Sequence, residues 1–216
     1  MDAFLSYHHE DRHVAGKVCE VLATLGIDGF MAHEDIAVSH EWHDAILEAL
    51  ANADIFVALL SKKYLKSCYC LQESGVAVFR KTELTIVPLS IDGTIPPGFM
   101  NRVQAKSIDP DDVRETDVLA GVAKHDLAFV VEQLAAQIAS SGSYETAEFN
   151  FARLAPFLRG LDPKLATKVL SASDGNNQVW YARKNRPILR GMLKTYAHSV
   201  PDGIIESLTD KLDRIR

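Results

Sequence analysis

The sequence comprises 216 residues, of which 47% are hydrophobic and 24% charged, and its formal net charge is −6. This balance is typical of a globular protein, and no apolar run approaches the roughly 20 residues that a membrane-spanning helix needs. Three cysteines, an odd number, argue against a disulfide framework, and a strand-like start without a charged and then apolar leader argues against export, so we expect a cytoplasmic protein.

The charge is divided unevenly along the chain. Residues 1–144 carry a net charge of −10, whereas residues 145–216 carry a net charge of +4. The change coincides with Ser140-Ser-Gly-Ser143, a polar stretch of flexible composition. We therefore predict two modules, a first domain over residues 1–140 and a small helical module over residues 141–216.

Strand and helix patterns alternate through the first module. Short apolar runs predict strands at residues 3–7, 27–32, 55–60, 85–91 and 105–108, although Pro88 is unfavourable inside a central strand. Apolar residues at helical spacing predict helices over residues 14–25, 42–50 and 118–138, and another that carries Glu73. This alternation predicts an α/β fold whose parallel sheet is covered by helices on both faces.

The loops after the first three strands lie on one edge of that sheet. In a doubly wound order of 2-1-3-4-5, strands 1 and 3 flank the switch point, where a ligand crevice opens. Glu73 follows Tyr69 by one helical turn just beyond strand 3. The residues that we expect at this edge are Tyr7, His8, His9, residues 33–43, Tyr64, Tyr69 and Glu73.

Three segments in this order resemble a Toll/interleukin-1 receptor (TIR) domain of the bacterial kind. Residues 2–7 (DAFLSY) resemble the first box of the family, and residues 26–50 resemble its second region and the helix that follows. Residues 61–73 (SKKYLKSCYCLQE) resemble the segment that carries the catalytic glutamate, with Tyr69 where the family has a tryptophan. The joint occurrence of three ordered motifs over roughly residues 1–140 is more specific than any one of them.

The resemblance implies a flavodoxin-like five-stranded sheet and, in enzymatic members, cleavage of the nicotinamide–ribose bond of NAD⁺. The products are nicotinamide and either ADP-ribose or a cyclic isomer. Glu73 is then the catalytic residue, and NAD⁺ is a substrate rather than a cofactor. The resemblance implies further contacts with the substrate at Tyr7, His8, His9, Phe30, Asp35, Trp42 and Tyr69. Core packing is the favoured role for Phe30 and Trp42 and an equal alternative for Tyr7 and Tyr69, and a solvated loop is the alternative for the histidines.

The resemblance also implies partners. TIR domains meet through the loop after strand 2, so we expect self-association through residues 33–43 and a site that is completed between chains. The setting would be bacterial antiphage defence, with a downstream effector protein that responds to the nucleotide product. No membrane partner is expected.

One carboxylate suffices for this reaction. Ordinary glycoside hydrolysis uses two carboxyl groups, because an alkoxide leaving group must be protonated. Nicotinamide leaves a pyridinium as a neutral molecule, so no general acid is needed, and a fixed carboxylate can stabilise the cation-like ribose that remains. Glu73 meets that demand, and the alternative for a helix acid of this kind is a solvated surface position.

Other functions compete for the same residues. A non-catalytic interaction or adaptor module is the main alternative, although an adaptor has no need of an acid at position 73. A phosphorylation-switched receiver would need an aspartate at the end of strand 3, where this chain has Ser61. No glycine-rich loop follows strand 1, which disfavours a dinucleotide-dependent dehydrogenase. His40 and His43 have metal-ligand spacing, but no cysteine or well-placed acid completes a set, so we expect no metal site.

The second module reads as short helices. Asp162-Pro163 predicts a helix start before residues 164–172, residues 174–177 predict a turn, and Pro187 and Pro201 each predict a further start. Five basic residues form one side of this module, next to Trp180 and Tyr181, and this combination is compatible with nucleic-acid binding. The favoured interpretation is a solvated face, or a face that docks against the acidic first module. The members of that basic side are Arg183, Lys184, Arg186, Arg190 and Lys194.

Overall fold

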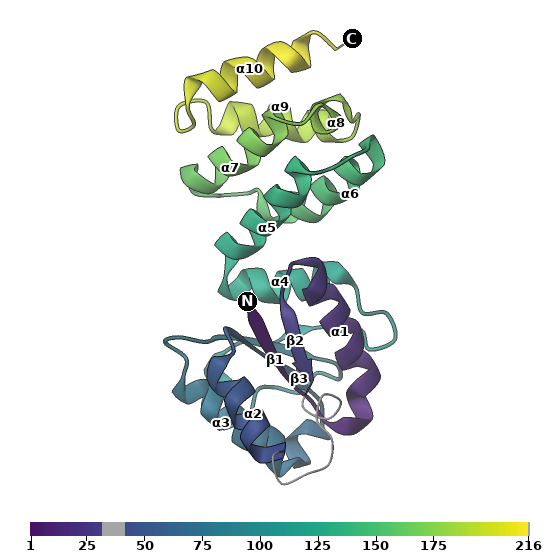
Figure 1. Cartoon of the computed structure of the whole chain (residues 1–216), viewed down its shortest axis with the longest axis vertical. Coiled ribbons are helices and arrows are strands. Elements are labelled where there is room, and N and C mark those ends of the chain that lie inside the picture. The colour runs from purple at the N-terminus through teal and green to yellow at the C-terminus, as the bar shows by residue number, and fades with distance from the viewer. Residues whose placement is uncertain (32–41, 216) are drawn as a thin grey trace. The chain divides into compact units, whose positions relative to one another are not determined.

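The computed structural model describes residues 1–31 and 42–215, apart from the side chains of Trp42 and His125. The chain divides into two compact units, Met1–Asp126 and Leu127–Arg216, and each is described by itself (Figure 1). None of the helices among the described residues combines the length and the apolar character needed to span a membrane.

The first unit is built on a five-stranded parallel sheet in the order β2-β1-β3-β4-β5. The strands are β1 (Asp2–Ser6), β2 (Asp28–Met31), β3 (Ile55–Leu60), β4 (Thr85–Ser90) and β5 (Lys106–Ser107). This order confirms the prediction of a doubly wound sheet with its switch point between β1 and β3.

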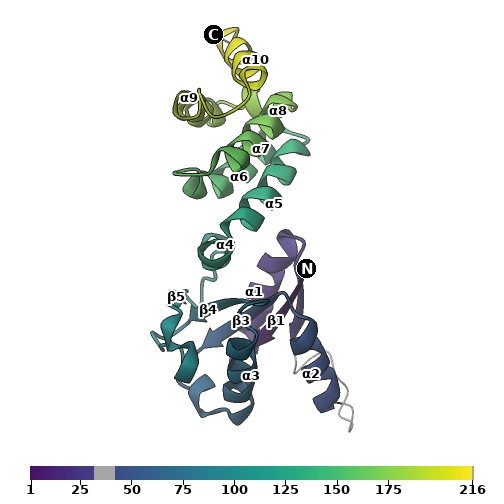
Figure 2. The ribbon, with the colours of Figure 1, turned by 90° about the vertical axis from the view of Figure 1, so that its left-hand side faces the viewer.

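Helices cover both faces of the sheet (Figures 1 and 2). On one face, α1 (Arg12–Thr24) packs against β2 and α4 (Glu115–His125) packs against β4, and the two helices also contact each other. On the other face lie α2 (Trp42–Asn52) and α3 (Cys68–Phe79), which both contact β1. Short 3-10 turns connect these elements at His9–Asp11, Tyr64–Lys66 and Gly98–Arg102.

The central strands explain why the apolar runs of the sequence become the core. Every residue of β3 is buried, as expected for a parallel strand that is covered on both faces. Phe4 of β1 stacks on Phe56 of β3, with ring centroids 5.9 Å apart, and packs against Phe30 of β2 at 5.6 Å. These rings join Ile46 and Leu50 of α2 in one hydrophobic cluster.

Pro88 is accommodated because β4 is paired on only one side at that position. The residue lies in register with Ala58 of β3, whereas β5 pairs with β4 only at Leu89 and Ser90. A proline cannot donate a ladder hydrogen bond, so it fits a strand position that has one neighbour rather than two.

The helix predicted over residues 118–138 is wrong as a single element. It is divided into α4 and α5 (Leu127–Ala139), because Asp126 adopts φ −143° and ψ 78° and leaves the helical region. Since α5 packs against helices of the second unit, the division between the compact units falls after Asp126, whereas the sequence suggested residue 140.

The second unit consists of helices in succession. Beyond α5 they are α6 (Tyr144–Leu154), α7 (Pro163–Asp174), α8 (Asn177–Tyr181), α9 (Asn185–Thr195) and α10 (Asp202–Asp213), with a 3-10 turn at Ala155–Phe157. The predicted start of α7 is confirmed, because the Asp162 carboxylate accepts a hydrogen bond from the Leu165 N–H at 3.0 Å. The predicted start at Pro187 is wrong: α9 begins at Asn185, and a proline fits its first turn because N–H groups there have no intrahelical acceptor.

Three residues of the basic side have partners within the second unit. Lys184 pairs with Glu148 at 2.7 Å, and Arg190 pairs with Asp213 at 2.7 Å. The Arg186 guanidinium donates to the Tyr181 carbonyl at 2.6 Å. These contacts connect α9 to α6, α8 and α10, which favours a structural role for this side over phosphate binding.

The place of α5 can be tested with fragments of the chain. We expect residues 127–216 to unfold cooperatively and residues 141–216 to be only weakly helical. The shorter fragment lacks the buried face of α5, which includes Val131, Leu134 and Ile138. Burial of one such side chain contributes about 1.5–3 kcal/mol, against a total stability of about 5–15 kcal/mol for a domain. Circular dichroism during heating provides the measurement, and identical melting of the two fragments would contradict the assignment.

Candidate active site

The candidate site lies where β1 and β3 end at the carboxyl edge of the sheet. Ser6 is the last residue of β1, and Ser61 follows β3 directly. The chain leaves these two neighbouring strands for helices on opposite faces, α1 and α3, which is the arrangement that opens a ligand site in doubly wound folds. The side chains on this edge therefore come from the loop after β1 and from the segment between β3 and the middle of α3.

The local sequence aims Glu73 at this edge. The Ser67 hydroxyl caps α3 by accepting a hydrogen bond from the Cys70 N–H at 3.3 Å, so the helix begins at Cys68. Cys70, Glu73, Ser74 and Ala77 then recur at helical spacing and form the buried side of α3. The carboxylate thus faces the sheet and is not a solvated surface acid.

The Glu73 side chain is 7% exposed, and its Oε2 atom accepts a hydrogen bond of 2.5 Å from the Ser6 hydroxyl. Burial raises the pKa of Glu73 to about 7, since a charged carboxylate loses its hydration there, and the hydrogen bond from Ser6 offsets only part of that effect. The group therefore titrates near neutral pH, in the range where an acid or base of an enzyme is most useful.

A chain of hydroxyl groups supports the carboxylate. The Tyr64 hydroxyl lies 2.9 Å from the Ser6 oxygen and 2.8 Å from the Ser74 oxygen. Because Ser6 has one hydroxyl proton and gives it to Glu73, Tyr64 is the donor to Ser6 when the carboxylate is ionised. The bond from Tyr64 to Ser6 then polarises the bond from Ser6 to the negative charge, while the Ser74 hydroxyl donates to the Cys70 carbonyl at 2.8 Å.

A second set of contacts fixes the two loops against each other. The Ser61 hydroxyl donates to the buried Asp11 carboxylate at 2.6 Å, and it accepts a hydrogen bond from the Tyr64 N–H at 3.1 Å. On the surface, Lys63 pairs with Glu10 at 2.7 Å. The loop after β1 and the loop after β3, which position Ser6 and Tyr64, are therefore tied together twice.

Three of the predicted substrate contacts, Tyr69, His8 and His9, are exposed or half-buried in the structure. Tyr69 is 45% exposed, and its hydroxyl lies 3.5 Å from Nε2 of His43, so the two rings form one exposed aromatic surface a helical turn from Glu73. His8 is half-buried and His9 is exposed, with their ring centroids 4.3 Å apart.

Of the predicted contacts, Tyr7 is a core residue and Phe30 is partly buried. Tyr7 is 1% exposed, so its ring offers no surface to a ligand in this structure. Phe30 packs against Phe4 and the adjoining hydrophobic cluster. The burial of Tyr7 corrects the expectation of a ligand-facing ring at that position. Asp35, the loop 33–41 and the side chain of Trp42 lie outside the described residues.

Sequence reasoning missed some of the hydroxyl groups around Glu73. Ser6 donates to Glu73 directly, and Tyr64 and Ser74 continue the network. Tyr64 was expected at this edge, whereas Ser6 and Ser74 were not predicted as site residues. The positions of Ser6 and Ser74 in the sequence could have indicated their role. Ser74 follows Glu73 on the same buried side of α3, and Ser6 is a small polar residue directly after the apolar Ala-Phe-Leu run of β1.

The strand order 2-1-3-4-5 defines a flavodoxin-like α/β fold. The buried Glu73 carboxylate lies beside the switch point of this sheet, where such folds bind ligands. The family model of the TIR domain matches residues 3–124, more than half of the chain, and the chain belongs to this family. The matched segment lies within the first compact unit. No curated protein matches the chain.

The cost of burying Glu73 predicts a pH-dependent effect on stability. The pKa of this carboxyl is higher in the folded chain, about 7, than its ordinary value of 4.5. Folding is therefore not penalised below about pH 4.5, and the penalty grows until the pH passes about 7, where it reaches about 3 kcal/mol. We expect Glu73→Gln to melt near the wild-type temperature at pH 4.5 and several degrees above it at pH 8.5.

The control for this measurement is Glu20→Gln, which removes one charge at an exposed position of α1. Its melting temperature should follow that of the wild type at both pH values. A Glu73→Gln variant whose difference from the wild type does not change with pH would contradict the burial cost.

Proposed function

We propose that this chain is an NAD⁺ glycohydrolase or cyclase of the TIR family, with Glu73 as the catalytic residue. The reaction breaks the bond between C1′ of the ribose and the nicotinamide nitrogen. The bonding electron pair leaves with nicotinamide, which departs as a neutral base, and water or a second nucleophile of the same molecule then attacks C1′. The products are nicotinamide and ADP-ribose or its cyclic isomer.

The observation that carries the proposal is a buried carboxylate whose stabilising partner is a neutral hydroxyl. Within the described part of the chain, the pKa of Glu73 is set by burial and by the Ser6 hydroxyl, with no cation contributing. A buried anion without a cationic partner is costly, and a cation brought by a ligand would relieve that cost. The pyridinium of NAD⁺ and the ribosyl cation that forms as it leaves both meet this requirement.

Because the hydroxyl groups hold the Glu73 carboxylate in place, the site can stabilise the transition state more strongly than the bound substrate. Positive charge on the ribose grows as the glycosidic bond breaks, so a fixed negative group beside it stabilises the transition state most. Ser6 and Tyr64 hold the carboxylate in place before the reaction, so little reorganisation is needed. Tyr69 and His43 provide an exposed aromatic surface on which a ring of the dinucleotide could stack.

Assembly and biological setting complete the proposal. Self-association is a general property of TIR domains, and here we propose that it uses residues 33–43 and brings a second chain to the site. The nucleotide product would act on a downstream effector protein in bacterial antiphage defence, in the cytoplasm. The second unit would promote or restrain this assembly.

The second candidate function is that of a non-catalytic interaction module. One observation agrees with it, namely that the hydrogen-bond network around Glu73 forms without a ligand. Glu73, Ser6 and Tyr64 are joined by hydrogen bonds without a ligand, so a purely structural role in fixing α3 to β1 would account for this geometry. Such a role gives no reason for a carboxylate that titrates near pH 7, because an amide would serve as well without the burial cost.

The activity itself is the first test. Purified full-length protein at high concentration should release nicotinamide from NAD⁺, and Glu73→Gln should lower the rate by about a hundredfold or more, the loss expected when charge stabilisation is removed. The rate per chain should rise with protein concentration if assembly completes the site. Chromatography of the reaction mixture separates nicotinamide, ADP-ribose and cyclic products.

The exposed acid Glu20, replaced by Gln, is the matched control and should retain full activity. If wild type and Glu73→Gln release nicotinamide at equal rates, Glu73 is not catalytic. If neither releases it at any concentration while both are folded, the interaction module becomes the better description of the isolated protein.

The pH profile separates catalysis from structure. Since Glu73 must be ionised to act, kcat/KM should rise with pH through about 7, the pKa of the free protein. The profile of kcat should rise at lower pH, because a bound pyridinium favours the ionised carboxyl. Ser6→Ala removes the hydrogen bond that lowers the pKa of Glu73, so its kcat/KM profile should move to higher pH. An unchanged profile in Ser6→Ala would show that Ser6 does not position the carboxylate.

A further inference from the structure

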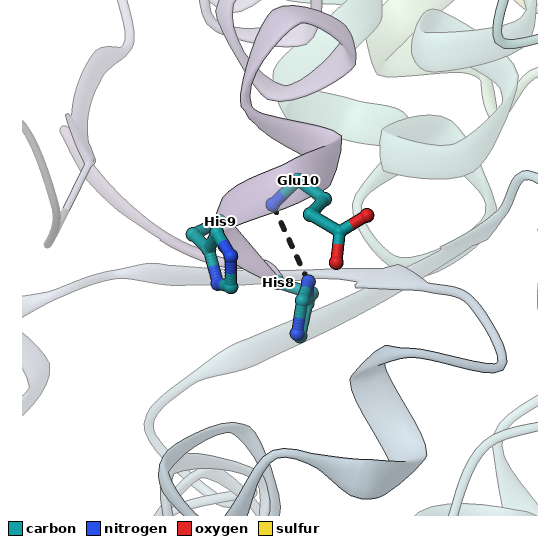
Figure 3. A group of neighbouring side chains, drawn as sticks. All are labelled: His8, His9 and Glu10. Atoms are coloured by element: carbon teal, nitrogen blue, oxygen red, sulfur yellow. Dashed lines mark hydrogen bonds between the residues drawn. The ribbon is translucent and has the colours of Figure 1, made fainter.

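A second group of chemically active side chains lies at the start of the first helix. His8, His9 and Glu10 follow one another between β1 and α1, and Figure 3 shows the two imidazole rings and the carboxylate gathered there. Their possible ligand atoms all lie within 4.8 Å of one another. The ring centroids of His8 and His9 are 4.3 Å apart. Rotations of the half-buried His8 and the exposed His9 and Glu10 side chains would bring such atoms onto one ion.

The orientation of His8 suits metal binding. Its Nδ1 atom accepts a hydrogen bond from the Glu10 N–H at 3.3 Å, so this nitrogen carries the lone pair and points toward the residue that would supply the carboxylate. The bond is long and hence weak, and a metal ion could take over the same lone pair at small cost.

The backbone beneath the group is held firmly. The Asp11 N–H donates to the His8 carbonyl at 2.7 Å, which closes the turn that carries all three side chains. Asp11 is itself buried and accepts a hydrogen bond from Ser61. The ligands therefore start from fixed positions, and binding would have to order only their side chains.

Glu10 has a competing partner that leaves one oxygen available. Its Oε2 atom accepts from the Lys63 ammonium at 2.7 Å, and both side chains are about half exposed. An exposed pair of this kind contributes only about 0–1 kcal/mol, so it does not prevent the carboxylate from turning to a divalent ion. When Glu10 coordinates the metal, its ion pair with Lys63, which joins the loops after β1 and β3, would be replaced by the bond to the ion.

We propose that His8, His9 and Glu10 bind one divalent transition-metal ion, Zn²⁺ or an ion of similar preference. Two imidazole nitrogens and one carboxylate oxygen form a ligand set that suits zinc and its neighbours, whereas Mg²⁺ and Ca²⁺ prefer oxygen ligands throughout. Water would occupy the remaining position. The ion would lie in the loop that follows Ser6, at the same edge as Glu73, but its binding does not depend on NAD⁺ cleavage.

The test is calorimetric titration of Zn²⁺ into the full-length, tag-free protein without nucleotide. We expect one ion per chain, and we expect His9→Ala and Glu10→Gln each to weaken binding by at least about tenfold. Lys63→Met should strengthen binding, because it removes the competitor for the Glu10 carboxylate. Circular dichroism without metal establishes that each variant is folded before its titration is interpreted.

Two other histidines serve as controls. His13 is exposed one turn further along α1, and His43 belongs to the pair with His40 that the sequence spaces for metal ligation. His13→Ala and His43→Ala should bind Zn²⁺ as tightly as the wild type. Loss of binding in either control, or wild-type binding by His9→Ala, would move the ion elsewhere and overturn the proposal, as would the absence of a binding event in the wild type.

Discussion

The hydrogen bond between the Ser6 hydroxyl and the buried Glu73 carboxylate is the contact on which the arrangement of the site depends. It joins the last residue of β1 to the second turn of α3, two elements that are far apart in the sequence. Without it, a carboxylate that is 7% exposed would have lost its water and gained no donor from the strand. The Tyr64 hydroxyl then fixes Ser6, so the segment after β3 and two core elements share a single polar junction.

The surrounding fold makes this junction rigid. β1 and β3 are buried on both faces, so Ser6 and Ser61 are carried to the edge by elements that cannot shift without opening the core. The loops beyond them are joined by Ser61 to Asp11 and by Lys63 to Glu10. A catalytic group needs positions held to within a fraction of an ångström, and such doubly tied loops on a packed sheet are suited to provide them.

The parts of this structure that follow from periodic patterns could be predicted from the sequence. Continuous apolar runs such as residues 55–60 indicated buried parallel strands, and the position of Glu73 one helical turn after Tyr69 placed an acid near the switch point. Pairwise contacts between polar residues could not be predicted in this way. The spacing of Ser6, Tyr64 and Ser74 says nothing about which hydroxyl meets the carboxylate, since that depends on how deeply α3 sits against the sheet.

The break at Asp126 shows a second limit of pattern reading. The apolar spacing of α4 continues into α5, so the sequence indicates one helix, but the two helices bury their apolar faces in different cores. Periodicity records that a face is apolar and carries no information about which elements cover it. The division of the chain after Asp126 is thus a tertiary property that the polar composition of residues 140–143 could not reveal.

The loop after β1 is connected to the Ser6–Glu73 hydrogen bond in two ways. Its first residues follow directly from Ser6, which holds Glu73, while Glu10 reaches Lys63 on the loop that leads to Tyr64. A change in the partner of Glu10 therefore alters the link between the two loops that carry the donors of the hydroxyl chain. The interior bond from Ser61 to Asp11 is buried and would persist through such a change. The outer tie is consequently the part of the site that can be adjusted while the position of Glu73 is kept.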